Sequence, residues 1–431
     1  MFQSLNESLF KTFDDLSEHI LKKILRLMEN ADLRADVITV VFNRYDKENS
    51  IKQMERERRG AGEITASHLV SGAREVPNYR LFLKGSANKA ALAAFVSDSL
   101  TMKAPTPLKN DQTIVLAGGF STAETVKLVN KTGVTTLPQL FSSQEKADTR
   151  LVLHAINLSK THSRVIICCD DTDVLVILLY FHTKGSLASE VYMHAGHSGR
   201  TVTRERYIHV HTIAAKLSDS ICLCLPAVHA LTGCDTTSAL FRIGKCTAFT
   251  KLSQHVANVR ELSQFGVTLL VSDALDVARR FVLLLYGQKA RQCSSLNALR
   301  FTLASTTNKE AAMLPPTDDV FKQHVLRTML QTAVWCHNDI ANPNLPGPVG
   351  HGRMIDDERC LRPNMYEMDC APVEVRDTTH LFYQDADCVT SAKCQCVTAG
   401  LPCIELCSCS NCPNRPVVNS FEFDTETEDE D

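Results

Sequence analysis

Two apolar runs separated by acidic residues form the clearest hydrophobic pattern of the chain. The first covers residues 165–169 and ends in Asp170, Asp171 and Asp173, and the second follows at 174–180. A continuous apolar run of this length is typical of a strand buried on both faces, as in a parallel sheet. Ligands of open α/β sheets bind at the carboxyl ends of the strands. Carboxylates crowded there repel one another unless a cation joins them, so we expect a hard divalent cation at this edge.

The rest of the chain alternates between helix and strand periodicity. Helical spacing of apolar residues covers 1–30, the stretch after Pro77, the stretch from about Ser143 and most of 258–345. Strand-like runs lie at 36–42, 113–117, 190–194 and 206–210, and an apolar segment at 221–231 leads into T-G-C-D. This alternation predicts the α/β class, with a mostly parallel sheet flanked by helices.

Shifts in composition divide the 431 residues into five predicted segments. The apolar elements predict an α/β domain over 1–265 and a helical extension over 266–345. Prolines and glycines gather from residue 342 onward, so residues 346–385 are predicted to be a linker. A Cys-rich module at 386–415 and an acidic tail at 416–431 follow.

The charge of the chain is distributed unevenly. The net charge is −3, and residues 421–431 contribute seven acids and no base, which leaves a net charge of +4 on residues 1–420. We interpret the tail as a disordered, solubilising end. The alternative is that the tail mimics nucleic acid in a basic groove, and it ranks below the first interpretation.

The first residues and the cysteines bear on the compartment. The chain begins M-F-Q-S-L-N-E-S, without the apolar stretch of a secretory signal, and it has no uncharged apolar run of 18 residues. We therefore expect a protein that is not secreted and has no membrane partner. Its 17 cysteines then indicate a reducing, intracellular setting, where cysteines are buried or bind metal.

Acidic side chains recur at the ends of the predicted apolar elements. Asp171 and Asp173 follow the strand, and Asp235 follows an apolar segment through a glycine. Glu145 and Asp148 lie at the start of a predicted helix, where acids interact favourably with the helix dipole. Each residue thus has a local explanation, but the repeated placement predicts a shared acidic site.

Three short motifs carry a resemblance to a known family. They are E-K-A-D at 145–148, D-T-D at 171–173, and G-C-D at 233–235 followed by F-R-I-G-K-C-T-A at 241–248. In order and approximate spacing they resemble the flap-endonuclease branch of the PIN-like nuclease superfamily, whose motifs are E-x-E, D-x-D and G-x-D. The resemblance covers residues 36–252. It implies a PIN-like sheet with a helix–two-turn–helix, and metal-dependent cleavage of nucleic acid.

The resemblance also implies roles for individual residues. It implies Mg²⁺ or Mn²⁺ ligands at Asp148, Asp171, Asp173 and Asp235. Glu145 is a shifted catalytic candidate, because a lysine occupies the first acidic position of the family's motif. Gly244 and Lys245 match the loop that grips the DNA backbone in the family. Two-metal cleavage of a phosphodiester needs such a carboxylate cage, and Mg²⁺ prefers oxygen ligands.

A basic segment at 51–59, I-K-Q-M-E-R-E-R-R, gives a further expectation. Lys52, Arg56 and Arg59 fall at i, i+4 and i+7, so they share one helical face. Spacing alone favours a solvated surface helix, in which the interleaved glutamates balance the charge. The resemblance to the family's gateway helix implies instead that Lys52 and Arg59 are catalytic and that Arg56 binds nucleic acid.

Two departures from the family concern its first acids. Asn43 stands where the family has an aspartate. The family's earlier aspartate, on its first strand, has no match, and we expect the sequence to be an N-terminally clipped form of the domain. Losing one or two acids weakens a metal site, which would abolish cleavage while leaving the binding of nucleic acid.

Seven cysteines are concentrated near the C-terminus. They are Cys388, Cys394, Cys396, Cys403, Cys407, Cys409 and Cys412. In a reducing compartment this density is typical of Zn²⁺ binding by thiolates. The pattern resembles the second half of a tesmin-type CXC domain, a DNA-binding zinc module of chromatin proteins. The first half differs, because Phe382 and Gln384 stand where earlier cysteines are expected.

Three hypotheses follow. The first is a PIN-like, metal-dependent nuclease with a zinc-binding CXC-like module, acting on DNA or, as an alternative, on RNA in the nucleus; such pairings resemble mobile-element-derived genes. The second is a nucleic-acid- or chromatin-binding protein that keeps the fold without catalysis. The third is a protein that only binds other proteins.

Overall fold

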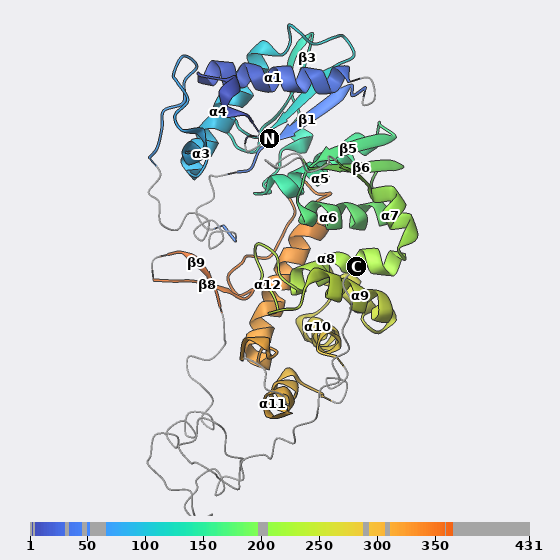
Figure 1. Cartoon of the computed structure of the whole chain (residues 1–431). Coiled ribbons are helices and arrows are strands. Elements are labelled where there is room, and N and C mark those ends of the chain that lie inside the picture. Colours follow the sequence, from blue (N-terminus) through green and yellow to red (C-terminus); the bar gives the residue numbers. More distant parts are fainter. Residues whose placement is uncertain are drawn as a thin grey trace, which may run out of the picture. The chain divides into compact units, whose positions relative to one another are not determined.

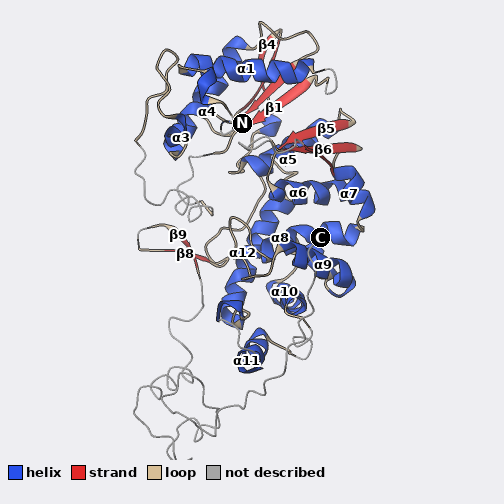
Figure 2. Cartoon of the chain, viewed as in Figure 1, coloured by secondary structure: helices blue, strands red, loops and turns tan. Residues whose placement is uncertain are grey.

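The chain folds into two compact units. The computed structural model describes residues 2, 5–30, 34–44, 50–51, 66–196, 206–287, 293–306, 311–357 and 359–364. Residues 1–285 and 324–363 form the first unit, and residues 286–323 and 364–431 form the second. The first unit combines helices with mixed sheets, which confirms the predicted α/β class (Figure 2).

The elements alternate along the chain much as the hydrophobic pattern predicts. The helices are η2 Glu7–Leu9, α1 Phe13–Glu29, α3 Tyr79–Phe82, α4 Ser86–Lys103, η3 Pro138–Leu140, α5 Ala147–Ser159, α6 Thr172–Thr183, α7 Val210–Lys216, α8 Asp219–Leu231, α9 Lys245–His255, η4 Val256–Asn258, η5 Arg260–Gln264, α10 Val271–Leu285, α11 Leu296–Thr306, η7 Ala311–Met313 and α12 Asp318–Cys336. The strands are β1 Val37–Val41, β2 Thr113–Ala117, β3 Val126–Asn130, β4 Gly133–Thr136, β5 Arg164–Cys168, β6 Glu190–Ala195, β7 Arg206–His209, β8 Arg353–Ile355 and β9 Leu361–Pro363.

The first sheet has the strand order β1-β2-β3-β4. β1 pairs with β2 in parallel, whereas β2–β3 and β3–β4 are antiparallel. The tight β3–β4 turn is fixed by Asn130, whose Oδ1 accepts hydrogen bonds from the backbone nitrogens of Thr132 and Gly133 at 3.0 and 3.1 Å. Helices α1 and α4 lie beside this sheet (Figure 1), and they share its core.

The second sheet has the order β5-β6-β7, with β5–β6 parallel and β6–β7 antiparallel. The prediction of a mostly parallel sheet is therefore wrong for the described strands, because strands that follow one another along the chain, β2–β3, β3–β4 and β6–β7, pair antiparallel. Burial on both faces of 165–169 is also wrong. Val165 and Ile167 are buried, whereas Ile166 is half-buried and Cys168 is exposed, so only one face of β5 is fully covered.

The second apolar run, which follows the aspartates, forms helix α6. Its buried residues include Val174, Ile177, Leu178 and Phe181, and they surround the helix axis. A helix that is apolar on all sides belongs in the interior of a domain. Helices α5, α7 and α8 pack against α6, which fixes the acidic N-terminus of α6 at the end of β5.

Three predicted boundaries shift in the structure. The helix expected from about Ser143 begins at Ala147, and helix α12 ends at Cys336 although helix was predicted to 345. The predicted linker at 346–385 starts with an antiparallel hairpin of β8 and β9. Helix α12 is divided between the two units, because residues 324–363 group with the first unit.

The described helices were also tested for membrane-spanning length and composition. No single one of them is long and apolar enough to span a bilayer, although α7 and α8, bent by 112°, pass the test as a pair.

Candidate functional site

The D-T-D motif lies at the N-terminus of α6, directly after β5. Asp171 is the N-cap residue, and its Oδ1 accepts a hydrogen bond from the backbone nitrogen of Asp173 at 2.9 Å. This is the usual role of aspartate at the start of a helix, because the first backbone N–H groups have no partner within the helix. Asp171 therefore stabilises α6 and at the same time lies at the predicted site.

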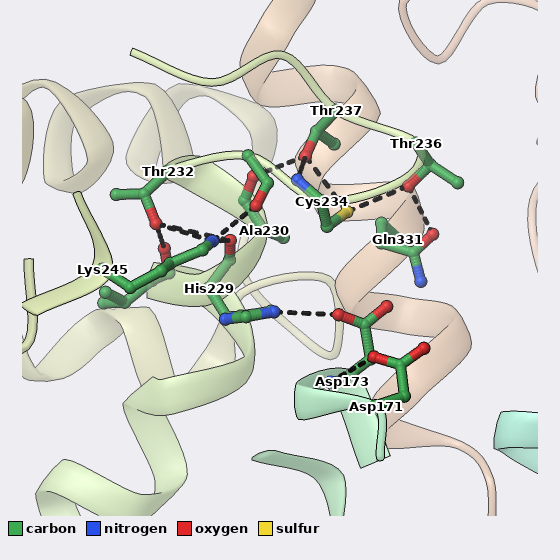
Figure 3. Close-up of polar contacts among 12 residues, drawn as sticks. Asp171, Asp173, His229, Ala230, Thr232, Cys234, Thr236, Thr237, Lys245 and Gln331 are labelled. Carbon is green, nitrogen blue, oxygen red and sulfur yellow. Dashed lines mark hydrogen bonds and ion pairs between the residues drawn. The ribbon is translucent and has the colours of Figure 1, made fainter. Parts of the chain in front are cut away.

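Asp173 is bound by a histidine from another helix. His229 lies in the last turn of α8, and its Nε2 is 2.9 Å from Asp173 Oδ1 (Figure 3). The two side chains are only 11% and 9% exposed. Burial raises the pKa of Asp173, but the hydrogen bond from His229 and the charges of Lys146 and His229 outweigh it, so the pKa is lowered overall. Asp173 is therefore ionised at neutral pH.

Asp235 is close enough to Asp173 to interact with it electrostatically. The charge of Asp235 raises the pKa of Asp173, in opposition to His229. Asp235 follows Gly233, whose φ is +103° and whose added Cβ would lie 2.6 Å from Ala239 Cα. Only glycine fits such a turn, so the glycine of G-C-D explains how the chain reverses after α8 and brings the aspartate back toward α6.

Three acids, one of them Asp171, gather around the thiol of Cys169. Burial raises the pKa of Cys169 to about 12, a hydrogen bond from the Asp171 backbone lowers it, and the charges of Asp148, Asp171 and Asp170 raise it. The distance from Asp171 N to Cys169 Sγ is 3.4 Å. Acids from the start of α5 and from the end of β5 thus share one neighbourhood.

The start of α5 is tied to the end of β1. Asn43 Oδ1 accepts a hydrogen bond from Ala147 N at 2.7 Å, and the backbone of Arg44 donates to Glu145 O at 3.0 Å. Glu145 also accepts a hydrogen bond from the hydroxyl of Ser50. Asn43 therefore holds the helix that carries Asp148.

Lys245 lies at the N-terminus of α9, but its ammonium turns toward the end of α8. It donates to the carbonyls of His229 and Gly233, and to Thr232 Oγ1 at 3.0 Å (Figure 3). The residue as a whole is exposed, whereas the enclosed ammonium loses solvation, which lowers the pKa of Lys245 to about 8. A cation at the C-terminus of a helix stabilises its last carbonyls, so Lys245 fixes the turn that leads to Asp235.

The predicted residues therefore fall into three groups. One neighbourhood holds Asp148 of α5, Asp171 and Asp173 at the start of α6, and Asp235 after α8. Glu145 precedes α5, three residues before Asp148. Gly244 caps α9 beside Lys245, and nothing within 4 Å would meet a Cβ there. Outside the described residues lie the gateway residues Lys52, Arg56 and Arg59, and Cys388, Cys394, Cys396, Cys403, Cys407, Cys409 and Cys412.

Sequence reasoning missed the two basic partners of Asp173. His229 is a single histidine on the apolar helix α8, and nothing in its spacing marks it as a site residue. Lys146 was noted only as an interruption of the acidic motif. Its position as N-cap of α5, two residues before Asp148, is the signal that could have drawn attention to it.

Comparison of the chain with models of protein families, with curated proteins and with solved structures finds no match in any of the three.

Proposed function

We propose that the chain is a metal-dependent, nuclease-like protein that cleaves phosphodiesters and adopts a PIN-like fold. The observation that carries this proposal is the gathering of four acids, Asp148, Asp171, Asp173 and Asp235, from three separate places in the sequence. Acids that only stabilise the first turn of a helix would not need to lie close to one another. Acids that share a neighbourhood at the end of a strand are what metal-assisted phosphodiester hydrolysis requires.

The chemistry of these donors fits a hard divalent cation. All four supply carboxylate oxygens, and the lowered pKa of Asp173 keeps that carboxylate ionised at neutral pH. In the described part of the chain, no three His, Cys, Asp or Glu side chains stand in an arrangement that would hold a metal, so the four carboxylates would have to draw closer together when the ion binds. Mg²⁺ or Mn²⁺ would be held by Asp171 and Asp173 together with Asp148 and Asp235, and when bound it supplies an activated water and stabilises the leaving oxygen.

Other residues of the chain hold the acidic side chains in position. His229 orients the carboxylate of Asp173 through Oδ1, and the N-cap bond of Asp171 sets the start of α6. Lys245 holds the α8–Asp235 turn through backbone carbonyls. Such outer hydrogen bonds keep ligating carboxylates in their productive orientation.

The test is cleavage by the full chain of labelled flap, nicked and single-stranded DNA, and of single-stranded RNA, with Mg²⁺ or Mn²⁺. Asp173→Asn and Asp235→Asn should each reduce the rate by about 100-fold or more, because a metal ligand contributes several kcal/mol to the transition state. Asp98→Asn, an exposed acid on α4, is the matched control and should cleave at the wild-type rate. Equal rates for all three variants would refute the acidic site.

A second candidate is a nucleic-acid-binding protein without catalysis. It is favoured because two of the acids already have partners within the chain. Asp173 interacts with His229 and Lys146, and Asp171 caps α6. Asn43 in place of an aspartate points the same way. Binding without cleavage, with an affinity that falls steeply with salt concentration, would establish this candidate. Binding that is insensitive to salt would instead favour a protein partner.

We further propose that the C-terminal cysteines form a zinc-binding, CXC-like module that contacts DNA or chromatin in the nucleus. The support is the concentration of seven cysteines within residues 388–412. Thiolate ligands and Zn²⁺ can stabilise a short segment that has little apolar core of its own.

A further inference from the structure

Gln331 of helix α12 is a buried polar residue beside the acidic site. It is 1% exposed, and its Oε1 accepts a hydrogen bond from Thr236 Oγ1 at 2.6 Å. Its Nε2 has no hydrogen-bond partner among the described residues. Because buried donors are nearly always satisfied in folded proteins, this amide nitrogen needs an acceptor.

The carboxylate of Asp173 is a candidate acceptor. Figure 3 shows the amide nitrogen of Gln331 turned toward Asp173, on the side away from His229. The ring of Trp335, one turn further along α12, lies 5.7 Å from the ring of His229, which itself binds Asp173. Helix α12 therefore reaches the acids, although it lies outside residues 36–252, the range of the family resemblance.

A hydrogen-bond network sets the orientation of this amide. Cys234 Sγ lies 3.3 Å from Thr236 Oγ1, and Thr236 in turn donates to Gln331 Oε1. Thr236 directly follows Asp235 in the chain. Because the amide oxygen is bound to Thr236, the amide nitrogen faces the acids. If the amide were flipped, its oxygen would face a carboxylate, which is unfavourable.

We propose that Gln331 is a positioning residue of the metal site. In the metal-bound site its Nε2 would donate to the carboxylate of Asp173 while its Oε1 accepts from Thr236, beside Asp235. The amide would then fix the carboxylate of α6 relative to the one in the turn after α8. This inference rests on the proposed metal site. The burial of Gln331 suits a residue that supports the ligands rather than one that contacts substrate. Loss of such a supporting partner commonly changes metal affinity by about 10- to 100-fold.

The test is the Mn²⁺ affinity of the full chain, measured from free Mn²⁺ by electron paramagnetic resonance. Thr236→Val keeps the shape of the side chain and removes the hydroxyl, whereas Thr236→Ser keeps the hydroxyl and removes the methyl group. A positioning role predicts about 10-fold weaker binding for Thr236→Val and wild-type binding for Thr236→Ser. A role in packing alone predicts the reverse order.

Gln331→Leu should weaken Mn²⁺ binding by about 10- to 100-fold. The matched control is Gln112→Leu, a buried glutamine that accepts from Lys109 N at the start of the first sheet, and it should bind Mn²⁺ as the wild type does. If the wild type binds Mn²⁺ and both Thr236→Val and Gln331→Leu bind it equally well, the positioning role is wrong and the proposed function stands. If the wild type binds no Mn²⁺, the metal site itself is wrong.

Discussion

At the scale of single residues, the aspartates could be predicted and their partners could not. Asp171 and Asp173 break an apolar run, so the hydrophobic pattern alone marks them. His229 and Gln331 lie within helices, and their partners come from other elements, because His229 binds Asp173 of α6 and Gln331 binds Thr236 after α8. Sequence spacing does not contain these tertiary contacts, which depend on how the helices pack.

His154 gives a prediction that concerns pH. This residue of α5 is 3% exposed, and burial together with the charge of Arg150 lowers the pKa of His154 to about 4. The unfolded chain takes up a proton on this histidine as the pH falls below about 6.5, whereas the folded chain does so only near 4. The stability that the neutral histidine preserves is therefore complete above about pH 6.5 and is lost as the pH falls toward 4.

His154→Phe removes this titration and keeps a ring in the core. Between pH 7 and pH 5 the wild type should lose about 2 kcal/mol more free energy of unfolding than the variant does. Urea unfolding followed by circular dichroism at both pH values measures the difference. Equal losses in the two proteins would show that His154 takes up a proton in the folded state as easily as in the unfolded one.

At the scale of elements, the positions of helices and strands were predictable where the apolar period is strong. The strands at 37–41 and 113–117 follow apolar runs rich in β-branched residues, and the sequence predicts both, and the strand at 190–195, at nearly these residues. Pairing direction was not predictable, because it depends on which strands become neighbours. The start of α5 differs from the predicted one, because Asn43, which lies after β1 and far away in the sequence, accepts a hydrogen bond from its first backbone nitrogen.

Helix α1 carries a capping box that the sequence displays in T-F-D-D. Thr12 Oγ1 accepts a hydrogen bond from Asp15 N at 3.2 Å, and Asp15 accepts one from Thr12 N at 2.9 Å. Thr12→Ala should destabilise the fold by about 1 kcal/mol, because a backbone donor loses its partner. Thr12→Ser keeps the hydroxyl and should retain most of that stability. Chemical unfolding of the three proteins compares them, and an unaltered Thr12→Ala would mean that the cap contributes nothing.

At the scale of the whole molecule, two kinds of metal chemistry are predicted in one chain. The acids of the first unit offer oxygen to Mg²⁺ or Mn²⁺, whereas the cysteines at 388–412 offer thiolates to Zn²⁺. Composition alone separates these two regions, because cysteine density and acidic motifs occur in different parts of the sequence. The gathering of the acids needed the fold, whereas the cysteines lie close together already in the sequence.

This separation predicts that the two metal sites can be removed independently. In the full chain, Cys394→Ser combined with Cys396→Ser should lower the zinc content measured by mass spectrometry, because serine does not replace a thiolate ligand. The Mn²⁺ affinity should stay at the wild-type value, since oxygen ligands select that ion. Asp173→Asn should do the opposite and weaken Mn²⁺ binding with zinc unchanged. An equal zinc content in wild type and the double cysteine variant would contradict the zinc module, and loss of both metals in either variant would contradict their independence.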